Sequence, residues 1–458
     1  MPLAILTHWS PHRSVRLGAT LLNTHPWRRH RLSTKSSTQP QMRPGLKVLF
    51  FGTDEFASCA LAALSKGMFS RTPAIAHIEL VCPPPRFKQR GKKLALVFKA
   101  KSAGQATKLG IRINNTPEEG GLQDWQVPAV DPDAGFGDGV RFDIGVVASF
   151  GMFLPRRIID SFPLGMVNVH PSLLPQYRGP SPVQQAIVNS DAVTGVTVQE
   201  VHPTRYDAGD VLAQVPYRLE PGMHRVDLLA QLGAVGGELA ARVLENLGYL
   251  RERALKQDDA QATATRLHTN LDTRIDWARM SAMDIMRMHW AHWGHIDVWS
   301  YVRVKNKTLA VKITELALPT ARQAPLKPDY LDYPPGTMFT ARKTRYVELS
   351  CIDGGRLHAT GFTVADKQPR DGLQFAAGYI KKSKEMRLLS MPPDARRPTP
   401  AFVYPEGHVR PDPEVARHIS DEPEFLARKN VVHPQEDTMG HLCVDDLEID
   451  YEDEHSVS

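Results

Sequence analysis

Met166-Val-Asn168-Val-His170-Pro-Ser172-Leu-Leu-Pro175-Gln-Tyr177-Arg178-Gly179-Pro-Ser-Pro182 starts as an apolar run typical of a strand and ends where a helical pattern begins. If residues 166–170 form a strand, its period of two places Asn168 and His170 on one face. An amide can polarise a carbonyl group, and an imidazole can exchange a proton near neutral pH. A lone pair of this kind is more often structural, because Asn caps turns and His satisfies local hydrogen bonds.

A second polar segment follows farther along the chain. It reads Tyr206-Asp207-Ala-Gly209-Asp-Val211-Leu212 and leads into another apolar run. Its first aspartate could reach back to His170 and orient the imidazole, as carboxylates do in other His-based sites. Taken together, the two segments favour a catalytic site over an isolated turn.

The two segments carry a resemblance to a known family. Asn168-x-His170-x-Ser172-Leu-Leu-Pro-x-x-Arg178-Gly179, followed by Asp207-x-Gly209, resembles the signature of the folate-dependent formyltransferases, in particular the methionyl-tRNA formyltransferases. Residues 46–57 resemble the first strand and turn of that family, and residues 142–155 resemble its folate-side strand and loop. The similarity extends from about residue 46 to about residue 388.

The resemblance implies an enzyme that transfers a formyl group from 10-formyltetrahydrofolate, its co-substrate, to the amino group of initiator methionyl-tRNA, with no metal. Asn168 would offer its amide to the formyl oxygen, His170 would take part in proton transfer and oxyanion stabilisation, and Asp207 would orient the imidazole. The residues expected at the folate site are Phe150, Gly151, Leu154, Pro155, Ser172, Leu173, Leu174 and Pro175. Leu173, Leu174 and Pro175 are also expected to pack and so fix the motif.

Other interpretations remain open at this point. A related formyltransferase could act on glycinamide ribonucleotide or a sugar amine, and a non-catalytic mitochondrial RNA-binding protein could use the same fold. Arg178 could contact substrate or form a structural ion pair. The stretch before Asp207, residues 202–206, is about one residue longer than the common family version, which could form a bulge or move the carboxylate away from His170.

Strand-like and helix-like runs alternate from Leu46 onward, which predicts a doubly wound, mostly parallel α/β sheet of the Rossmann-like formyltransferase type. The expected strands are 48–51, 75–81 and 144–148, and the expected helices are 56–64 and 224–247. The turn that begins at Gly52 lacks the three-glycine spacing of a dinucleotide fingerprint, so no nicotinamide cofactor is indicated. These elements define a catalytic domain over residues 46–249.

A second block follows a polar, weakly patterned linker at residues 250–268. Residues 281–293 read as a helix, and short β-like runs occupy 298–304, 308–317, 337–339, 346–350 and 356–364. Several short strands suggest a small barrel, and the resemblance makes residues 269–388 an OB-like, tRNA-binding domain.

Basic residues mark the candidate tRNA contacts. The segment 83–93 is basic, contains one aromatic residue and lacks the period of a strand or helix, so we expect a loop near the acceptor end. The predicted contacts are Arg86, Lys88, Arg90, Lys92 and Lys93 in this segment, with Arg303, Lys305 and Lys307 in the second domain. A solvated basic loop is the alternative.

The ends of the 458-residue chain differ from its middle in composition. Residues 1–53 contain no Asp or Glu but several Arg, which is typical of a mitochondrial transit peptide and predicts a matrix protein with a transit peptide at about residues 1–45. A disordered nucleic-acid-binding arm is the alternative. Residues 389–458 are Pro-rich and then acidic, and read as a disordered tail. No run is long enough for a membrane helix, the four scattered cysteines show no metal spacing, and the family resemblance suggests a monomer.

Overall fold

The computed structural model describes residues 45–69, 74–90, 93–119, 121–304, 307–340, 344–364, 367–380 and 387–390. Residues 1–44, which hold nearly all of the predicted transit peptide, and residues 391–458, which hold most of the predicted tail, lie outside them. None of the helices in the described ranges combines the length and the apolar character that a membrane crossing requires.

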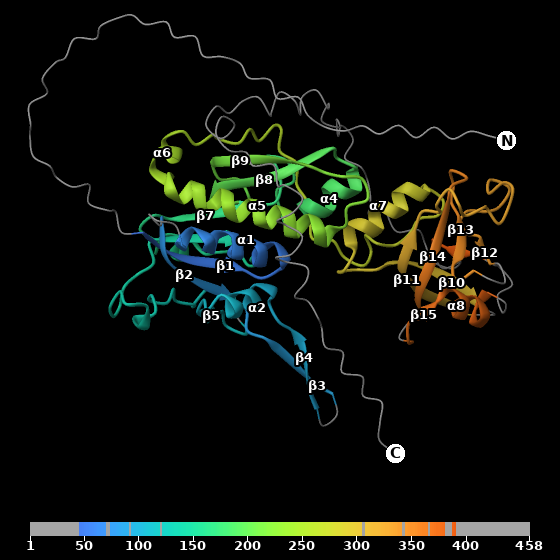
Figure 1. Ribbon diagram of the computed structural model, residues 1–458, viewed down its shortest axis with the longest axis horizontal. Coiled ribbons are helices and arrows are strands. Elements are labelled where there is room, and N and C mark those ends of the chain that lie inside the picture. Colours follow the sequence, from blue (N-terminus) through green and yellow to red (C-terminus); the bar gives the residue numbers. More distant parts are fainter. Residues whose placement is uncertain are drawn as a thin grey trace, which may run out of the picture. The chain divides into compact units, whose positions relative to one another are not determined.

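A seven-stranded sheet in the order β5-β2-β1-β6-β7-β8-β9 forms the first half of the described chain (Figure 1). Its strands are β1 (Leu46–Gly52), β2 (Ile75–Cys82), β5 (Ile113–Asn115), β6 (Ile144–Ala148), β7 (Met166–His170), β8 (Val193–Glu200) and β9 (Val211–Arg218). The strands from β5 to β7 run parallel, whereas β8 and β9 are antiparallel to their neighbours. The prediction of a doubly wound, mostly parallel sheet is confirmed.

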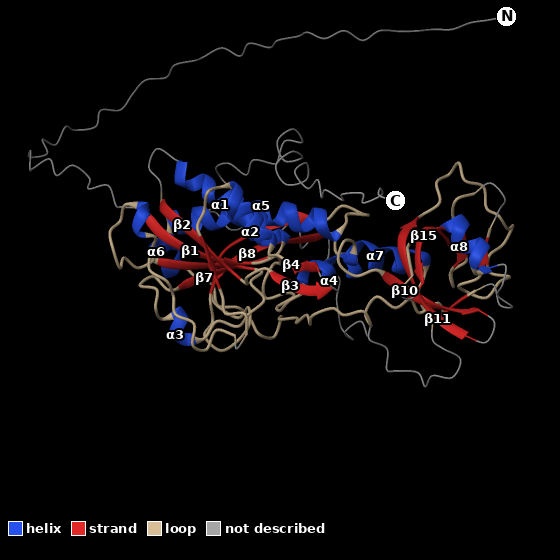
Figure 2. Ribbon diagram, turned by 90° about the horizontal axis from the view of Figure 1, so that it is seen from below, coloured by secondary structure: helices blue, strands red, loops and turns tan. Residues whose placement is uncertain are grey.

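Both faces of this sheet are buried, as a central parallel sheet requires. In β1 the side chains of Val48 and Phe50 join one apolar core, and those of Leu49 and Phe51 join another. Figure 2 shows α1 (Glu55–Ser65) and α5 (Arg225–Glu245) on one face and α3 (Arg156–Ile159) on the other. The remaining elements of this half are α2 (Lys101–Lys108), α4 (Pro182–Asn189), α6 (Leu247–Glu252) and the 3-10 helices η1 (Lys66–Phe69) and η2 (Pro132–Ala134).

Small residues let α5 approach α1 closely. A Cβ atom added at Gly233 would lie 2.6 Å from the Phe56 carbonyl oxygen, and one at Gly237 would lie 2.3 Å from that of Ala60. The leucines and valine of the predicted stripe on α5 are all buried: Leu228, Leu229, Leu232, Leu239, Val243 and Leu244. One face of the sheet is therefore covered by the closely packed pair of helices α1 and α5, which holds the strands and their carboxyl ends in position.

The chain order places a topological switch point at that carboxyl edge. From β1 the chain moves to β2 and β5 on one side, and then returns to β6 on the other side of β1. The loops that follow β1 and β6 therefore diverge, and ligands of doubly wound sheets bind at this kind of switch point.

The basic segment predicted to be a loop is instead a β-hairpin, and the loop prediction is wrong. Strands β3 (Arg86–Arg90) and β4 (Lys93–Phe98) pair antiparallel, with Phe87 opposite Leu96. In Figure 1 the hairpin projects away from the seven-stranded sheet. Cross-strand pairing gives the segment its regularity although most of its described side chains face solvent.

The second half contains an antiparallel, OB-like sheet in the order β12-β13-β14-β11-β10-β16, with β15 paired to β14. Its elements are α7 (Ala282–His292), β10 (Val298–Val304), β11 (Lys307–Ala317), β12 (Met338–Phe339), β13 (Val347–Ser350), β14 (Arg356–Val364), β15 (Arg370–Asp371), α8 (Gly372–Gly378) and β16 (Leu388–Leu389). Ser281 and Asp284 form a capping box that starts α7 where the sequence predicted a helix. The predicted OB-like fold is thereby confirmed, while the domain boundaries stay predictions.

Candidate active site

The predicted catalytic residues meet at the carboxylate of Asp207. Its Oδ1 accepts hydrogen bonds from Asn168 Nδ2 at 2.8 Å and from Gln199 Nε2 at 3.2 Å. Its Oδ2 accepts one from the backbone N–H of Gly179 at 2.9 Å. The carboxylate therefore ties β7, β8 and the loop after β7 together at the carboxyl edge of the sheet.

The longer stretch before Asp207 does not carry the carboxylate away from His170. His202 Nδ1 accepts the backbone N–H of Thr204 at 3.2 Å and of Arg205 at 3.0 Å, so the stretch folds into a compact turn. Asp207 then takes a left-handed backbone conformation with φ of 48°. Its Oδ1 lies 3.5 Å from His170 Nδ1.

Both ring nitrogens of His170 face oxygen atoms. Nδ1 faces Asp207, and Nε2 lies 2.9 Å from the carbonyl oxygen of Tyr177. Only 6% of the imidazole is exposed. The ring is thus held from both sides and has little freedom to turn.

The loop after β7 is anchored by buried polar groups. The Tyr177 hydroxyl donates to Asp191 Oδ2 at 2.6 Å and accepts from Asn189 Nδ2 at 2.9 Å. Burial, followed by the nearby Asp191 carboxylate, raises the pKa of Tyr177, so its phenol stays protonated. Ser172 is fully buried and donates to the Gln176 carbonyl oxygen at 2.6 Å. These contacts hold the loop and leave the phenol no catalytic task.

Of the eight predicted folate residues, four are buried, one is exposed, and Pro155, Leu173 and Pro175 are partly buried. Phe150 and Leu154 are 3% and 6% exposed, and the Phe150 ring meets Phe51 edge to face at 5.3 Å between centroids. Leu174 is 4% exposed. These side chains and Ser172 are buried and pack beneath the loops of the site. Gly151 is exposed and has φ of 77°.

An exposed aromatic pair beside the site was missed from the sequence. Phe153 is 41% exposed and Tyr206 is 64% exposed, and their rings meet edge to face at 5.4 Å. They come from the loop after β6 and from the residue before Asp207. Large exposed rings on adjacent loops would have been the signal, but nothing in the sequence brought residues 153 and 206 together.

Asp54 stands at the switch point itself, directly after β1. Its Oδ1 caps α1 by accepting the backbone N–H of Ala57 at 3.1 Å. Burial raises the pKa of Asp54 to about 6, against the opposing effects of that N–H and of Arg225. The group is close to half-titrated at mildly acidic pH, a property common among residues of functional crevices.

The environment of Arg178 is that of a structural ion pair. Its Nη2 lies 2.8 Å from Asp259 Oδ1, and its Nε donates to Gln257 Oε1 at 2.9 Å. The same aspartate binds Arg205 at 2.9 Å. Of the two alternatives weighed for Arg178, the structural one matches these contacts.

A family model described as "Formyl transferase" matches residues 135–244, which include Asn168, His170 and Asp207. Methionyl-tRNA formyltransferase of Roseiflexus castenholzii is 35% identical over 293 residues, which cover 64% of this chain and 84% of that protein. The chain belongs to the methionyl-tRNA formyltransferase family. The mitochondrial relative from Rattus norvegicus is 30% identical over 56% of this chain and 60% of its own length, and the human one is 29% identical over 68% and 73%.

Solved structures similar to this family member include HypX from Aquifex aeolicus. It has a TM-score of 0.47 and 15% identity, and the match covers 78% of this chain and 51% of that chain.

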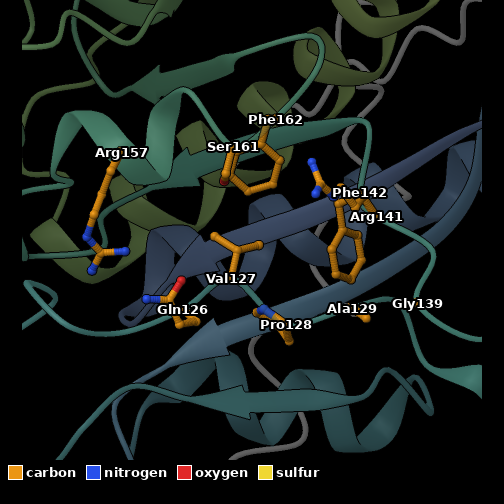
Figure 3. Close-up of a pocket in the computed structure, with 10 residues that line it drawn as sticks. All are labelled: Gln126, Val127, Pro128, Ala129, Gly139, Arg141, Phe142, Arg157, Ser161 and Phe162. Carbon is orange, nitrogen blue, oxygen red and sulfur yellow. The ribbon is translucent and has the colours of Figure 1, made fainter.

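A cavity of about 320 Å³ lies away from Asn168, His170 and Asp207. Figure 3 shows its lining, which includes Phe142 and Phe162. These residues precede β6 and β7, whereas Ser149 and His170 lie at the opposite ends of those strands. The cluster around Asp207 therefore defines the candidate site, and the cavity does not.

The predicted tRNA contacts of this family member are exposed wherever their side chains are described. Arg86 and Lys88 on the hairpin are exposed, as are Arg303 and Lys307 on β10 and β11. Lys92 and Lys305 lie outside the described residues, and the side chains of Arg90 and Lys93 are also outside them. No group of three or more potential metal ligands occurs in the part of the chain that the structure describes.

Proposed function

We propose that this protein transfers the formyl group of 10-formyltetrahydrofolate to the amino group of methionyl-tRNA for the start of mitochondrial translation. The observation that carries the proposal is the convergence of Asn168, His170 and the Gly179 N–H on and around Asp207. Formyl transfer needs a hydrogen-bond donor for the developing oxyanion and a group that accepts the proton of the amine. The cluster contains both.

Each residue has a separate task in this proposal. Asn168 uses one amide hydrogen on Asp207 at 2.8 Å, which fixes its orientation and leaves its second hydrogen for the formyl oxygen. His170 would accept the proton that the amine loses when the new C–N bond forms. The bond between the formyl carbon and N10 of the folate would break, and N10 would take up a proton as tetrahydrofolate leaves. Asp207 holds the imidazole in place and stabilises its charged form.

The residues around the switch point, next to Asp207, suit a reduced folate. When bound, 10-formyltetrahydrofolate supplies the electrophilic formyl carbon. The exposed loop at Gly151 would offer backbone contacts, since a Cβ added there would meet no atom within 4 Å. The rings of Phe153 and Tyr206 would offer apolar surface at the mouth, and the buried Phe150 would support the loop from below.

The hairpin supports tRNA as the acceptor. Arg86 and Lys88 present positive charge to solvent, and Phe87 is 53% exposed. Cations neutralise phosphates and an exposed ring can stack on an unpaired base, so the hairpin suits the end of an acceptor stem. Arg303 and Lys307 would add a second basic contact from the OB-like domain.

Two observations support the mitochondrion as its location. Residues 1–53 carry Arg and Lys without any Asp or Glu. The rat and human relatives are both named as mitochondrial methionyl-tRNA formyltransferases.

The test is a formylation assay of the purified full chain with 10-formyltetrahydrofolate and methionyl-tRNA. We expect activity with methionyl-tRNA and none with uncharged tRNA. His170→Ala should abolish it, and Asn168→Ala should slow it on the order of a hundredfold, the usual cost of one lost oxyanion donor. Glycinamide ribonucleotide and an amino sugar serve as competing acceptors.

The assay separates this proposal from its competitors. Preference for either small amine over methionyl-tRNA would assign the chain to another formyltransferase reaction. A folded chain that binds tRNA but formylates none of the acceptors would refute the enzymatic proposal. Thermal unfolding of both variants checks that lost activity does not reflect lost fold.

A further inference from the structure

The segment that follows α6 runs alongside the catalytic loop. The backbone N–H of Thr263 donates to the Pro175 carbonyl oxygen at 3.2 Å, and its hydroxyl accepts the N–H of Tyr177 at 2.8 Å. The N–H of Arg178 donates to the Thr263 carbonyl oxygen at 2.9 Å, and Arg178 and Ala264 form a parallel bridge. The stretch predicted as a plain linker is therefore hydrogen-bonded to the loop that carries Gly179.

Gln257, earlier in the same segment, contacts backbone carbonyl oxygens of the turn that carries Asp207. Its Nε2 lies 3.0 Å from the carbonyl oxygen of Asp207, 2.8 Å from that of Gly209 and 3.0 Å from Gln199 Oε1. Its Oε1 accepts the Arg178 Nε–H at 2.9 Å. One half-buried amide thus joins the Asp207 turn, β8 and the catalytic loop.

These contacts fall on a backbone that needs support. Asp207 has φ of 48°, a left-handed conformation that costs a non-glycine residue free energy unless its surroundings fix it. Gln199, which binds the Asp207 carboxylate, also accepts the N–H of Gly209 at 3.1 Å. Gln257 therefore bonds to the Asp207 turn directly and through Gln199.

We propose that Gln257 is a positioning residue for formyl transfer. It fixes the turn at Asp207, and through Asp207 it sets the placement of Asn168 and His170. The inference rests on the proposed function. Because Gln257 acts through another residue, its loss should change the rate of the chemical step much more than the binding of either substrate.

The test compares kcat and KM of the full chain with those of Gln257→Met, which keeps the length of the side chain but removes its polar atoms. We expect kcat to fall about tenfold to a hundredfold, since small misplacement of catalytic groups has costs of this size. KM for methionyl-tRNA and for 10-formyltetrahydrofolate should stay within about threefold. Gln261→Met is the matched control, because Gln261 is exposed in the same segment and bonds to Asp258.

Gln257→Glu separates the contact with Asp207 from the contact with Arg178. A carboxylate still accepts the Arg178 N–H but has no hydrogen to donate to the Asp207 carbonyl oxygen. We expect it to lose kcat as Gln257→Met does. Wild-type kcat in the glutamate variant would overturn the inference, because Gln257 would then serve Arg178 alone.

The remaining outcomes are equally informative. An active wild type with unimpaired kcat in Gln257→Met, or with a loss confined to KM, would overturn the inference and leave the proposed function intact. A wild type without formylation would overturn the proposed function and the inference with it. Should Gln257→Met unfold, Gln257→Glu decides the matter, since its charge is compensated by Arg178.

Discussion

The carboxylate of Asp207 is bound by three hydrogen-bond donors besides the ring of His170. Two are side-chain amides, Asn168 and Gln199, and the third is the N–H of Gly179. A carboxylate with this many fixed donors cannot rotate to follow a moving imidazole. His170 is therefore oriented by a rigid neighbour, and the rigidity comes from residues on three separate segments.

At this scale the sequence identified some of the cluster and missed the rest. Asn168, His170 and Asp207 are chemically distinctive and stand in a long motif. Gln199 lies on β8 opposite Asn168, and a search for polar residues on the shared face could have found it. Gln257 lies in a polar stretch without periodicity, so only the folded chain reveals its partners.

Gly179 packs closely against the segment that follows α6. It has φ of 102°, and an added Cβ would lie 2.5 Å from the Thr265 carbonyl oxygen. We predict that Gly179→Ala lowers the free energy of unfolding. The loss should exceed, by about 1–3 kcal/mol, that of Gly→Ala at a position with a similar positive φ but no neighbouring atoms. The substitution should also reduce kcat, because the N–H of residue 179 would leave Asp207.

The matched control for that prediction is Gly137→Ala. Gly137 has φ of 91°, and a Cβ there would meet no atom within 4 Å. Urea unfolding of both variants isolates the effect of the contact with Thr265. Equal losses of stability would mean that the 179–265 contact relaxes without cost.

Among the elements, several that bury apolar side chains were predictable, although the buried strand β8 was not predicted. Strands β6, β7, β10 and β14 begin and end where the sequence predicted, because apolar runs bounded by turns leave little choice of register. The hairpin β3–β4 was taken for a loop, since most of its described side chains face solvent and give no apolar face to detect. The segment after α6 was missed because it is held mainly by backbone hydrogen bonds, which carry no sequence signal.

The hairpin yields a prediction about tRNA affinity. Replacing Arg86 and Lys88 together by Gln should weaken binding of methionyl-tRNA. It should also reduce the steepness of log K against log salt concentration by about 1 to 2, because binding releases fewer counterions when phosphate contacts are lost. Arg141→Gln with Arg156→Gln is the control, since both side chains are exposed and neither belongs to the hairpin. An unchanged slope in the hairpin variant would exclude these two residues as phosphate contacts.

Helix α7 yields a prediction about pH. His289 is 4% exposed, its Nε2 is buried without a hydrogen-bond partner among the described residues, and burial lowers its pKa from 6.5 to about 4. Between these values the unfolded chain binds more protons than the folded one, so stability rises with pH and is lost as pH falls.

We therefore expect the wild type to lose about 2 kcal/mol more than His289→Gln in its free energy of unfolding between pH 7.5 and pH 5. Denaturant unfolding of both proteins at the two pH values measures the difference. A pH dependence that is the same in both would show that His289 keeps its ordinary pKa in the folded chain.

Across the whole molecule, the positive charge is concentrated at one end. The chain has 56 basic and 50 acidic side chains, and eight of the basic ones lie in residues 1–53, where no acidic residue occurs. Residues 54–458 thus carry 48 basic and 50 acidic side chains. This part therefore has a net charge of −2 and no general attraction to RNA, so the proposed binding of tRNA must depend on local features such as the hairpin.

That distribution separates two roles for the N-terminal segment. If it is a transit peptide, replacing Arg28, Arg29 and Arg31 by Gln in the full chain should reduce import into isolated mitochondria severalfold and leave tRNA affinity unchanged. Arg141, Arg156 and Arg218, all exposed and remote from the N-terminus in sequence, provide a triple-Gln control with the same loss of charge. If the segment is instead a basic arm for nucleic acid, the first variant should import normally and bind methionyl-tRNA more weakly, with a smaller salt slope. Import and tRNA binding, measured on the same two variants, therefore distinguish a targeting sequence from a nucleic-acid-binding arm.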